Sequence, residues 1–143
     1  MSNVLLRHRG ISEMEFYKTA DTIRGELTRF LMNDKYVPKK WRFVFTYPTI
    51  ELIKQLFSDM IEANDIYPHT DEDVARRKAI QSKTIDGCEK IYEQLQYMLT
   101  TLNYRNVDAD HPIATQLLKV FDLIDMEEKL LKAWRRSTKI IEN

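Results

Sequence analysis

The sequence predicts an all-α protein, an antiparallel up-and-down bundle of four helices. Apolar residues recur at steps of three and four along four long stretches, the spacing that places side chains on one face of an α-helix. The chain has 143 residues but only three glycines and four prolines, so we expect long helices with few turns. Its length suits one domain with a real core, and short connections between successive helices favour an antiparallel arrangement.

Residues 1–11 are expected to form an N-terminal arm outside the bundle, and residues 12–143 the bundle itself. Ser12 has the character of a helix N-cap, and Glu15, three residues later, completes a capping box. The first helix should therefore follow Ser12 and end near residues 33–34. Its apolar face contains Phe16, Ala20, Ile23, Leu27, Phe30 and Leu31.

The second helix is expected to start with Pro38, because proline suits a first turn in which its missing N–H costs little. Residues 41–47 are aromatic and β-branched, which also suits a strand. No second clear strand exists to pair with them, so we interpret them as helix, kinked or interrupted at Pro48. The helix should end at residues 64–65. Its main face contains Ile50, Ile53, Phe57, Met60 and Ile61, and Leu52 and Leu56 widen it.

The third helix should begin at Thr70, with Asp73 at the capping-box position, and should run to about Leu102. Its apolar residues include Ile85, Cys88, Ile91, Tyr92, Leu95, Met98 and Leu99. After a polar loop, Asp110 is expected to cap the fourth helix, and Pro112 fits its first turn. The main face of this helix contains Ile113, Leu117, Val120, Phe121, Ile124, Leu131 and Trp134.

The apolar arcs of the second and fourth helices look wider than one bundle core needs. In the fourth helix, Leu118, Leu123 and Leu130 lie partly off the main face. Two interpretations stay open. These residues either pack the edges of the core or form subunit interfaces.

Composition limits the classes of protein to consider. Lys and Arg number 22 and Asp and Glu number 22, so any anion-binding surface must come from local segregation of charge. The single cysteine, Cys88, excludes an intramolecular disulfide and a Cys-based metal site, and we expect a buried thiol. No apolar run approaches the roughly 18 residues of a membrane span. The apolar stretch at residues 4–6 is too short for a signal peptide, so we expect a cytoplasmic protein.

Catalytic motifs are missing from the sequence. The three histidines are scattered, without metal-ligand spacing, and are expected to be solvated: His8, His69 and His111. No Glu-x-x-His pair, phosphate-binding loop or nucleophile elbow occurs. The acidic residues 71–73 are expected to lie at a helix N-terminus, and Asp125, Glu127 and Glu128 on a solvated face. We therefore expect no enzyme, no cofactor and no metal site.

Basic residues form three clusters: Lys39, Lys40 and Arg42; Arg76, Arg77 and Lys78; and Lys132, Arg135, Arg136 and Lys139. In an antiparallel bundle, the start of the third helix and the end of the fourth can lie together, so the last two clusters can merge. The hypothesis is a surface that contacts the phosphates of RNA or DNA. The simpler alternative is solvated faces, with basic residues favoured at a helix C-terminus by the helix dipole.

Several stretches carry a family resemblance: residues 1–5 and 12–17; residues 63–68; Arg76-Arg77 followed by residues 88–90 and 94–95; and residues 130–137. The resemblance that they carry extends over nearly the whole chain. The sequence resembles the four-helix-bundle family of the accessory variability determinant of diversity-generating retroelements (avd-like). Bundle proteins encoded in ribosomal-RNA intervening sequences are related to that family.

The resemblance implies a small helical bundle that assembles as a homo-oligomeric ring, a pentamer in the founding member. It implies binding of nucleic acid and of a reverse transcriptase, in a complex that supports mutagenic complementary-DNA synthesis. The founding member is basic, whereas this chain has a net charge of zero. The alternative function is a protein-interaction or scaffold module without nucleic-acid binding.

Overall fold

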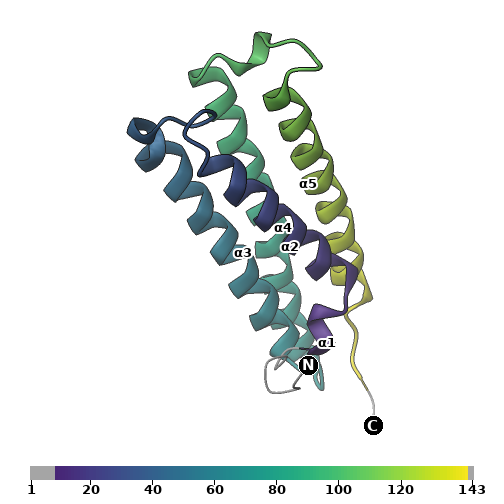
Figure 1. The fold of residues 1–143 in the computed structure, drawn as a ribbon. Coiled ribbons are helices and arrows are strands. Elements are labelled where there is room, and N and C mark those ends of the chain that lie inside the picture. Colours follow the sequence, from purple (N-terminus) through teal and green to yellow (C-terminus); the bar gives the residue numbers. More distant parts are fainter. Residues whose placement is uncertain (1–8, 142–143) are drawn as a thin grey trace.

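The computed structural model describes residues 9–141, and these residues form helices and loops without a β-strand. Four long helices lie alongside one another: α2 (Glu15–Leu31), α3 (Tyr47–Asp65), α4 (Asp71–Thr101) and α5 (Pro112–Ser137) (Figure 1). A short helix, α1 (Arg9–Ser12), precedes α2. The expectation of an all-α chain is confirmed.

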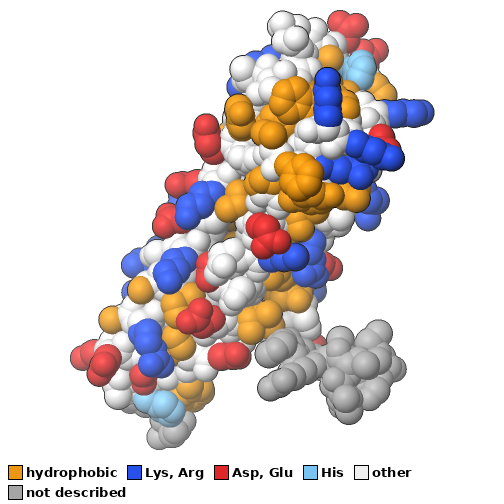
Figure 2. Space-filling view, turned by 90° about the vertical axis from the view of Figure 1, so that its left-hand side faces the viewer, with side chains coloured by type: hydrophobic (Ala, Val, Ile, Leu, Met, Phe, Trp, Pro, Cys, Tyr) orange, Lys and Arg blue, Asp and Glu red, His pale blue; other side chains and the backbone are white. Residues whose placement is uncertain are grey.

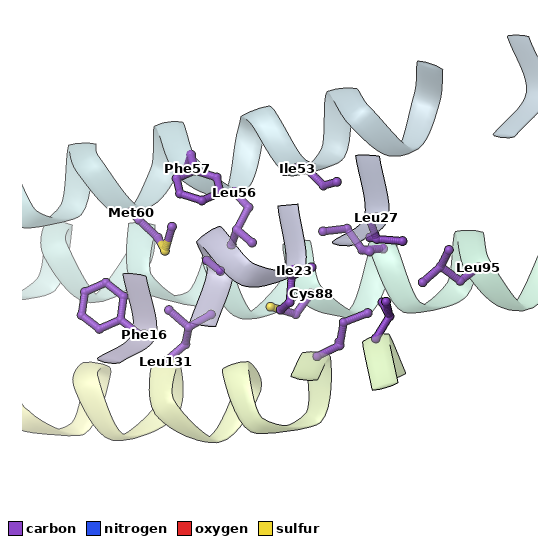
Figure 3. Packing of buried hydrophobic residues seen from close by; sticks show 14 of the residues in the cluster. Phe16, Ile23, Leu27, Ile53, Leu56, Phe57, Met60, Cys88, Leu95 and Leu131 are labelled. Atoms are coloured by element: carbon purple, nitrogen blue, oxygen red, sulfur yellow. The ribbon is translucent and has the colours of Figure 1, made fainter. Parts of the chain in front are cut away.

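One hydrophobic core lies between the long helices. Figure 3 shows side chains from all four converging there, among them Leu27 of α2, Met60 of α3, Leu95 of α4 and Leu131 of α5. These four side chains have no exposed surface. Burial of one such side chain contributes about 1.5–3 kcal/mol to folding. All six residues of the predicted first apolar face are buried, which confirms that helical register.

The start of the bundle differs from the expectation. Ile11 is only 1% exposed and belongs to the core. The prediction that the N-terminal arm outside the bundle extends to residue 11 is therefore wrong for Ile11. Ser12 ends α1, and the N-cap of α2 is Met14, without a side-chain cap hydrogen bond. The predicted capping box of Ser12 and Glu15 is therefore wrong. An N-cap needs extended backbone, whereas Ser12 lies in the short helix that also holds the buried Ile11. Residues 1–8 of the expected arm lie outside the described residues.

Residues 39–46 are helical, as predicted, but in two unusual forms. A 3₁₀ turn, η2 (Lys39–Trp41), is followed by a π-helix, η3 (Arg42–Thr46). Pro48 then lies in the first turn of α3, where a missing N–H costs little. Pro48 has no N–H to donate to the carbonyl of Val44, four residues earlier. The side-chain amide of Gln94 in α4 donates to that oxygen, at 2.8 Å.

Replacing Gln94 by alanine should therefore lower the free energy of unfolding by about 1–2 kcal/mol, because the partly buried carbonyl loses its side-chain donor. Urea denaturation followed by circular dichroism measures the loss. The control is Glu93→Ala, which truncates an exposed neighbour on the same helix. Equal stabilities of the two variants would contradict this role of Gln94.

The long helix α4 begins with the predicted capping box. The Asp73 N–H donates to Thr70 Oγ1 at 3.1 Å, and the Asp73 carboxylate accepts from the Thr70 N–H at 3.3 Å. At α5 the predicted cap is wrong, because His111 rather than Asp110 occupies the N-cap. His111 Nδ1 accepts the Ile113 N–H at 3.1 Å. The physical reason is Pro112, which favours extended backbone in the residue before it, as an N-cap requires.

The helix ends near the three basic clusters lie at two opposite ends of the molecule (Figure 1). The start of α4 lies beside the end of α5, close to α1, and the Ile141 N–H there donates to the carbonyl of Pro68 at 2.9 Å. The start of α3 and the end of α4 lie at the far end. Across residues 9–141, none of the helices combines the length and the apolar composition that crossing a membrane requires.

Candidate nucleic-acid interface

Two of the three basic clusters meet where α4 begins and α5 ends. Arg135 Nε donates to Ser82 Oγ at 2.8 Å and to the carbonyl of Lys78 at 3.2 Å. The Arg77 guanidinium lies over the indole of Trp134, with Cζ 5.5 Å from the ring centre. The expected proximity of these clusters is confirmed. We call their seven residues the basic end surface: Arg76, Arg77, Lys78, Lys132, Arg135, Arg136 and Lys139.

Two members of the basic end surface are used within the fold. Arg77 is half-buried, and its Nη1 donates to the carbonyl of Ile66 at 3.0 Å. Burial lowers the pKa of Arg77 from its ordinary value. Arg135 is likewise half-buried between α4 and α5. These two side chains hold the ends of α3, α4 and α5 together and have less freedom to reach a ligand.

Four members of the basic end surface are exposed: Arg76, Lys132, Arg136 and Lys139. Lys78 is half-exposed. Arg76 faces Asp73 at 3.8 Å, but the Arg76 side chain is 64% exposed, and an exposed ion pair of this kind contributes little energy. The four exposed cations are therefore the residues best placed to contact phosphate.

The chemistry available at this end is electrostatic. The first turn of α4 carries Asp71, Glu72 and Asp73, which complement the helix dipole as expected and limit the positive charge. Among the described residues, no group of three or more His, Cys, Asp or Glu side chains is placed to hold a metal ion. Lysine and arginine side chains here can bind an anion as point charges or forked donors.

Glu127 does not lie on a solvated face, which corrects the expectation for the acidic run of α5. Its side chain is fully buried, and neither carboxylate oxygen has a hydrogen-bond partner. Burial raises the pKa of Glu127 to about 8. Cys88 is buried as expected, and burial together with the charge of Glu127 raises the pKa of its thiol. One signal was present in the sequence: Glu127 falls in the same helical row as Ile124 and Leu131.

The third basic cluster lies at the opposite end of the bundle, so it does not join the basic end surface (Figure 1). Arg42 forms an ion pair with Asp34, and Lys39 Nζ lies 3.9 Å from the same carboxylate. The sequence interpretation missed the neighbouring Phe43, whose side chain is 81% exposed. Its exposure was not predictable from periodicity, because residues 42–46 adopt a π-helix.

The wide apolar arcs mostly pack the edges of the core. Leu56 is buried, and Leu52, Leu123 and Leu130 are half-buried against the core cluster. Leu118, at 57% exposed, is the exception among these residues. It borders an open groove of about 540 Å³ between the end of α4 and the start of α5, lined also by Leu99, Tyr104, Leu117 and Phe121.

Comparison with protein-family models, with curated proteins and with solved structures gives no match to this chain. The positions of its charged and apolar side chains therefore carry the functional assignment.

Proposed function

We propose that this chain is a non-enzymatic helical bundle that binds RNA or DNA through the basic end surface. The observation that carries the proposal is the contact of Arg135 with the main chain of Lys78, which brings residues 76–78 and 132–139 to one place. Four exposed cations there supply the positive charge that phosphates attract. Contacts of this kind position a nucleic acid without reading its sequence.

The resemblance to the avd-like family supports further parts of the proposal. The four long helices form an antiparallel up-and-down bundle, and copies of the chain assemble as a homo-oligomeric ring, a pentamer by resemblance. A reverse transcriptase is the protein partner, and the complex works in the cytoplasm as the accessory factor of a diversity-generating retroelement.

The test is the salt dependence of binding to a structured RNA and to duplex DNA, measured by filter retention. The logarithm of affinity should fall linearly with the logarithm of salt concentration. Changing Arg76, Lys132, Arg136 and Lys139 together to glutamate should weaken binding by about 10–100-fold at moderate salt and flatten this slope. The expected loss reflects phosphate contacts replaced by repulsion.

The control variant changes four other exposed lysines to glutamate, Lys18, Lys54, Lys83 and Lys90, and so alters the net charge equally. It should bind several-fold more tightly than the basic-end variant. Equal losses would show that overall charge, not the basic end surface, controls binding. A wild-type protein that retains neither nucleic acid at low salt would refute the proposed function.

The second candidate is a protein-interaction module without nucleic-acid binding. The specific observation that favours it is the apolar groove bordered by the exposed Leu118. Lack of nucleic-acid retention at low salt, together with a stable oligomer in sedimentation, would support this candidate over the first.

A further inference from the structure

A second surface at the far end of the bundle combines exposed aromatic rings with positive charge. We call it the aromatic end surface and define it by five residues: Lys39, Lys40, Trp41, Phe43 and Tyr47. Phe43 is 81% exposed and Tyr47 is 44% exposed. Their rings meet edge to face, with centres 5.4 Å apart. Figure 2 shows hydrophobic and basic side chains gathered on the upper part of the face it presents.

The π-helix η3 holds Phe43 outward. Phe45 and Thr46 of the same turn are fully buried. The centre of the Phe45 ring lies 5.7 Å from that of Trp41 and 5.2 Å from that of Tyr97. These ring contacts fix the side of the turn that faces the core. Thr46 Oγ1 also donates to the carbonyl of Leu31 at 2.9 Å. Because these three contacts anchor the turn, Phe43 is displayed on a helical element rather than on a free loop.

Positive charge lies next to these rings. Lys39 and Lys40 are both exposed, and the Lys40 ammonium lies 5.8 Å from the centre of the Trp41 ring. Asp34 is the carboxylate paired with both Lys39 and Arg42. Because one carboxylate is shared by two cations, positive charge is in excess here and favours an anionic partner. The exposed rings beside it favour a partner that also has planar groups.

We infer that the aromatic end surface binds unpaired nucleotides, so that the nucleic acid recognised by this chain includes a single-stranded segment. This inference rests on the proposed function and names its substrate class. Bases of a single strand can stack on exposed aromatic rings whatever their sequence, while neighbouring lysines contact the phosphates. Bases inside a duplex are not available for such stacking. An apolar protein partner would match Phe43 and Tyr47 but would offer no anionic group to the exposed Lys40.

The test compares binding of a fluorescent oligothymidylate of about 20 nucleotides and of a duplex of the same length, by anisotropy at fixed salt. The double variant Phe43→Ala, Tyr47→Ala should bind the oligothymidylate about 30-fold more weakly, since two stacking platforms are removed, and the duplex almost unchanged. The control variant Phe43→Tyr, Tyr47→Phe keeps both rings and should retain binding. Because Phe43 is mostly exposed, the thermal unfolding midpoint should be nearly the same in all variants.

The outcomes separate this inference from the proposed function. If the wild type binds neither probe, the proposed function fails and the inference fails with it. If the wild type binds but the double alanine variant binds the oligothymidylate equally well, only the inference is overturned. If the variant instead changes its mass in sedimentation while keeping its affinity, the surface is a protein contact, and the inference is again overturned.

Discussion

The wild type is expected to lose stability between about pH 5 and pH 9, and replacing Glu127 by glutamine should remove most of that loss. Glu127 is fully buried without a hydrogen-bond partner for either oxygen, so its charged form is strongly disfavoured in the fold. Burial raises its pKa from 4.5 to about 8. The folded protein therefore binds this proton more tightly than the unfolded chain does.

The sign of the pH effect follows from this pKa shift. Below pH 4.5 the Glu127 carboxyl is protonated in both the folded protein and the unfolded chain. The folded state then has the full stability that the neutral carboxyl allows. Between pH 4.5 and about pH 8 this stabilisation is lost progressively, because the unfolded chain releases the proton while the folded protein keeps it, and above about pH 8 the loss levels off. A shift of this size corresponds to a change on the order of 5 kcal/mol in the free energy of unfolding.

Urea denaturation of the wild type and of Glu127→Gln at several pH values measures this effect. The two stability curves should diverge as the pH rises, with the variant the more stable at pH 9. Glu128→Gln serves as the comparison: burial also raises the pKa of Glu128, but this side chain is only half-buried, so the curve of that variant should depart from the wild-type curve much less than that of Glu127→Gln. Parallel curves for the wild type and Glu127→Gln would show that Glu127 does not carry a buried proton.

Replacing Trp134 by alanine should lower the free energy of unfolding by about 3–5 kcal/mol, as expected for loss of a large core side chain. Trp134 is 7% exposed and stacks on Phe16 of α2, with ring centres 4.1 Å apart. The guanidinium of Arg77 also lies over its ring. The side chain therefore joins α2, α4 and α5 at the end that carries the basic end surface.

Trp134→Phe is the matched control. Phenylalanine keeps a ring for stacking on Phe16 and removes an indole N–H that has no hydrogen-bond partner in the structure. The expected loss is about 1 kcal/mol, because the smaller cavity is partly offset by removal of an unpaired buried donor. Denaturation with urea compares the two variants. Similar losses for alanine and phenylalanine would argue against ring packing as the source of the stabilisation.

Capping patterns in the sequence predicted a helix start correctly where only residues close in the chain determine it. Thr70 and Asp73 form the expected capping box, because every atom involved lies within four residues. The same signal at Ser12 failed, since burial of Ile11 in the core accompanies a helical turn there. A cap is thus predictable when no distant contact competes with it.

The candidate site was predictable only in part. Helical spacing and short connections were enough to expect residues 76–78 beside residues 132–139, and Arg135 does contact Lys78. The division of that cluster into exposed and half-buried cations was not predictable. It depends on which atoms the adjacent elements supply, such as the indole beneath Arg77 and the carbonyl of Ile66.

The sequence by itself determined the helical class of the chain and the buried face of most helices, because the 3.6-residue period ties each apolar side chain to one side of its helix. The tertiary structure alone decided the states of Glu127 and Phe43. Packing of α5 places a carboxyl group in the core without a partner, and a π-helical turn anchored by Phe45 leaves an aromatic ring in solvent. The helical row that Glu127 shares with Ile124 and Leu131 indicates its burial, but its lack of a partner and the exposure of Phe43 depend on contacts between elements far apart in the chain, which no local pattern specifies.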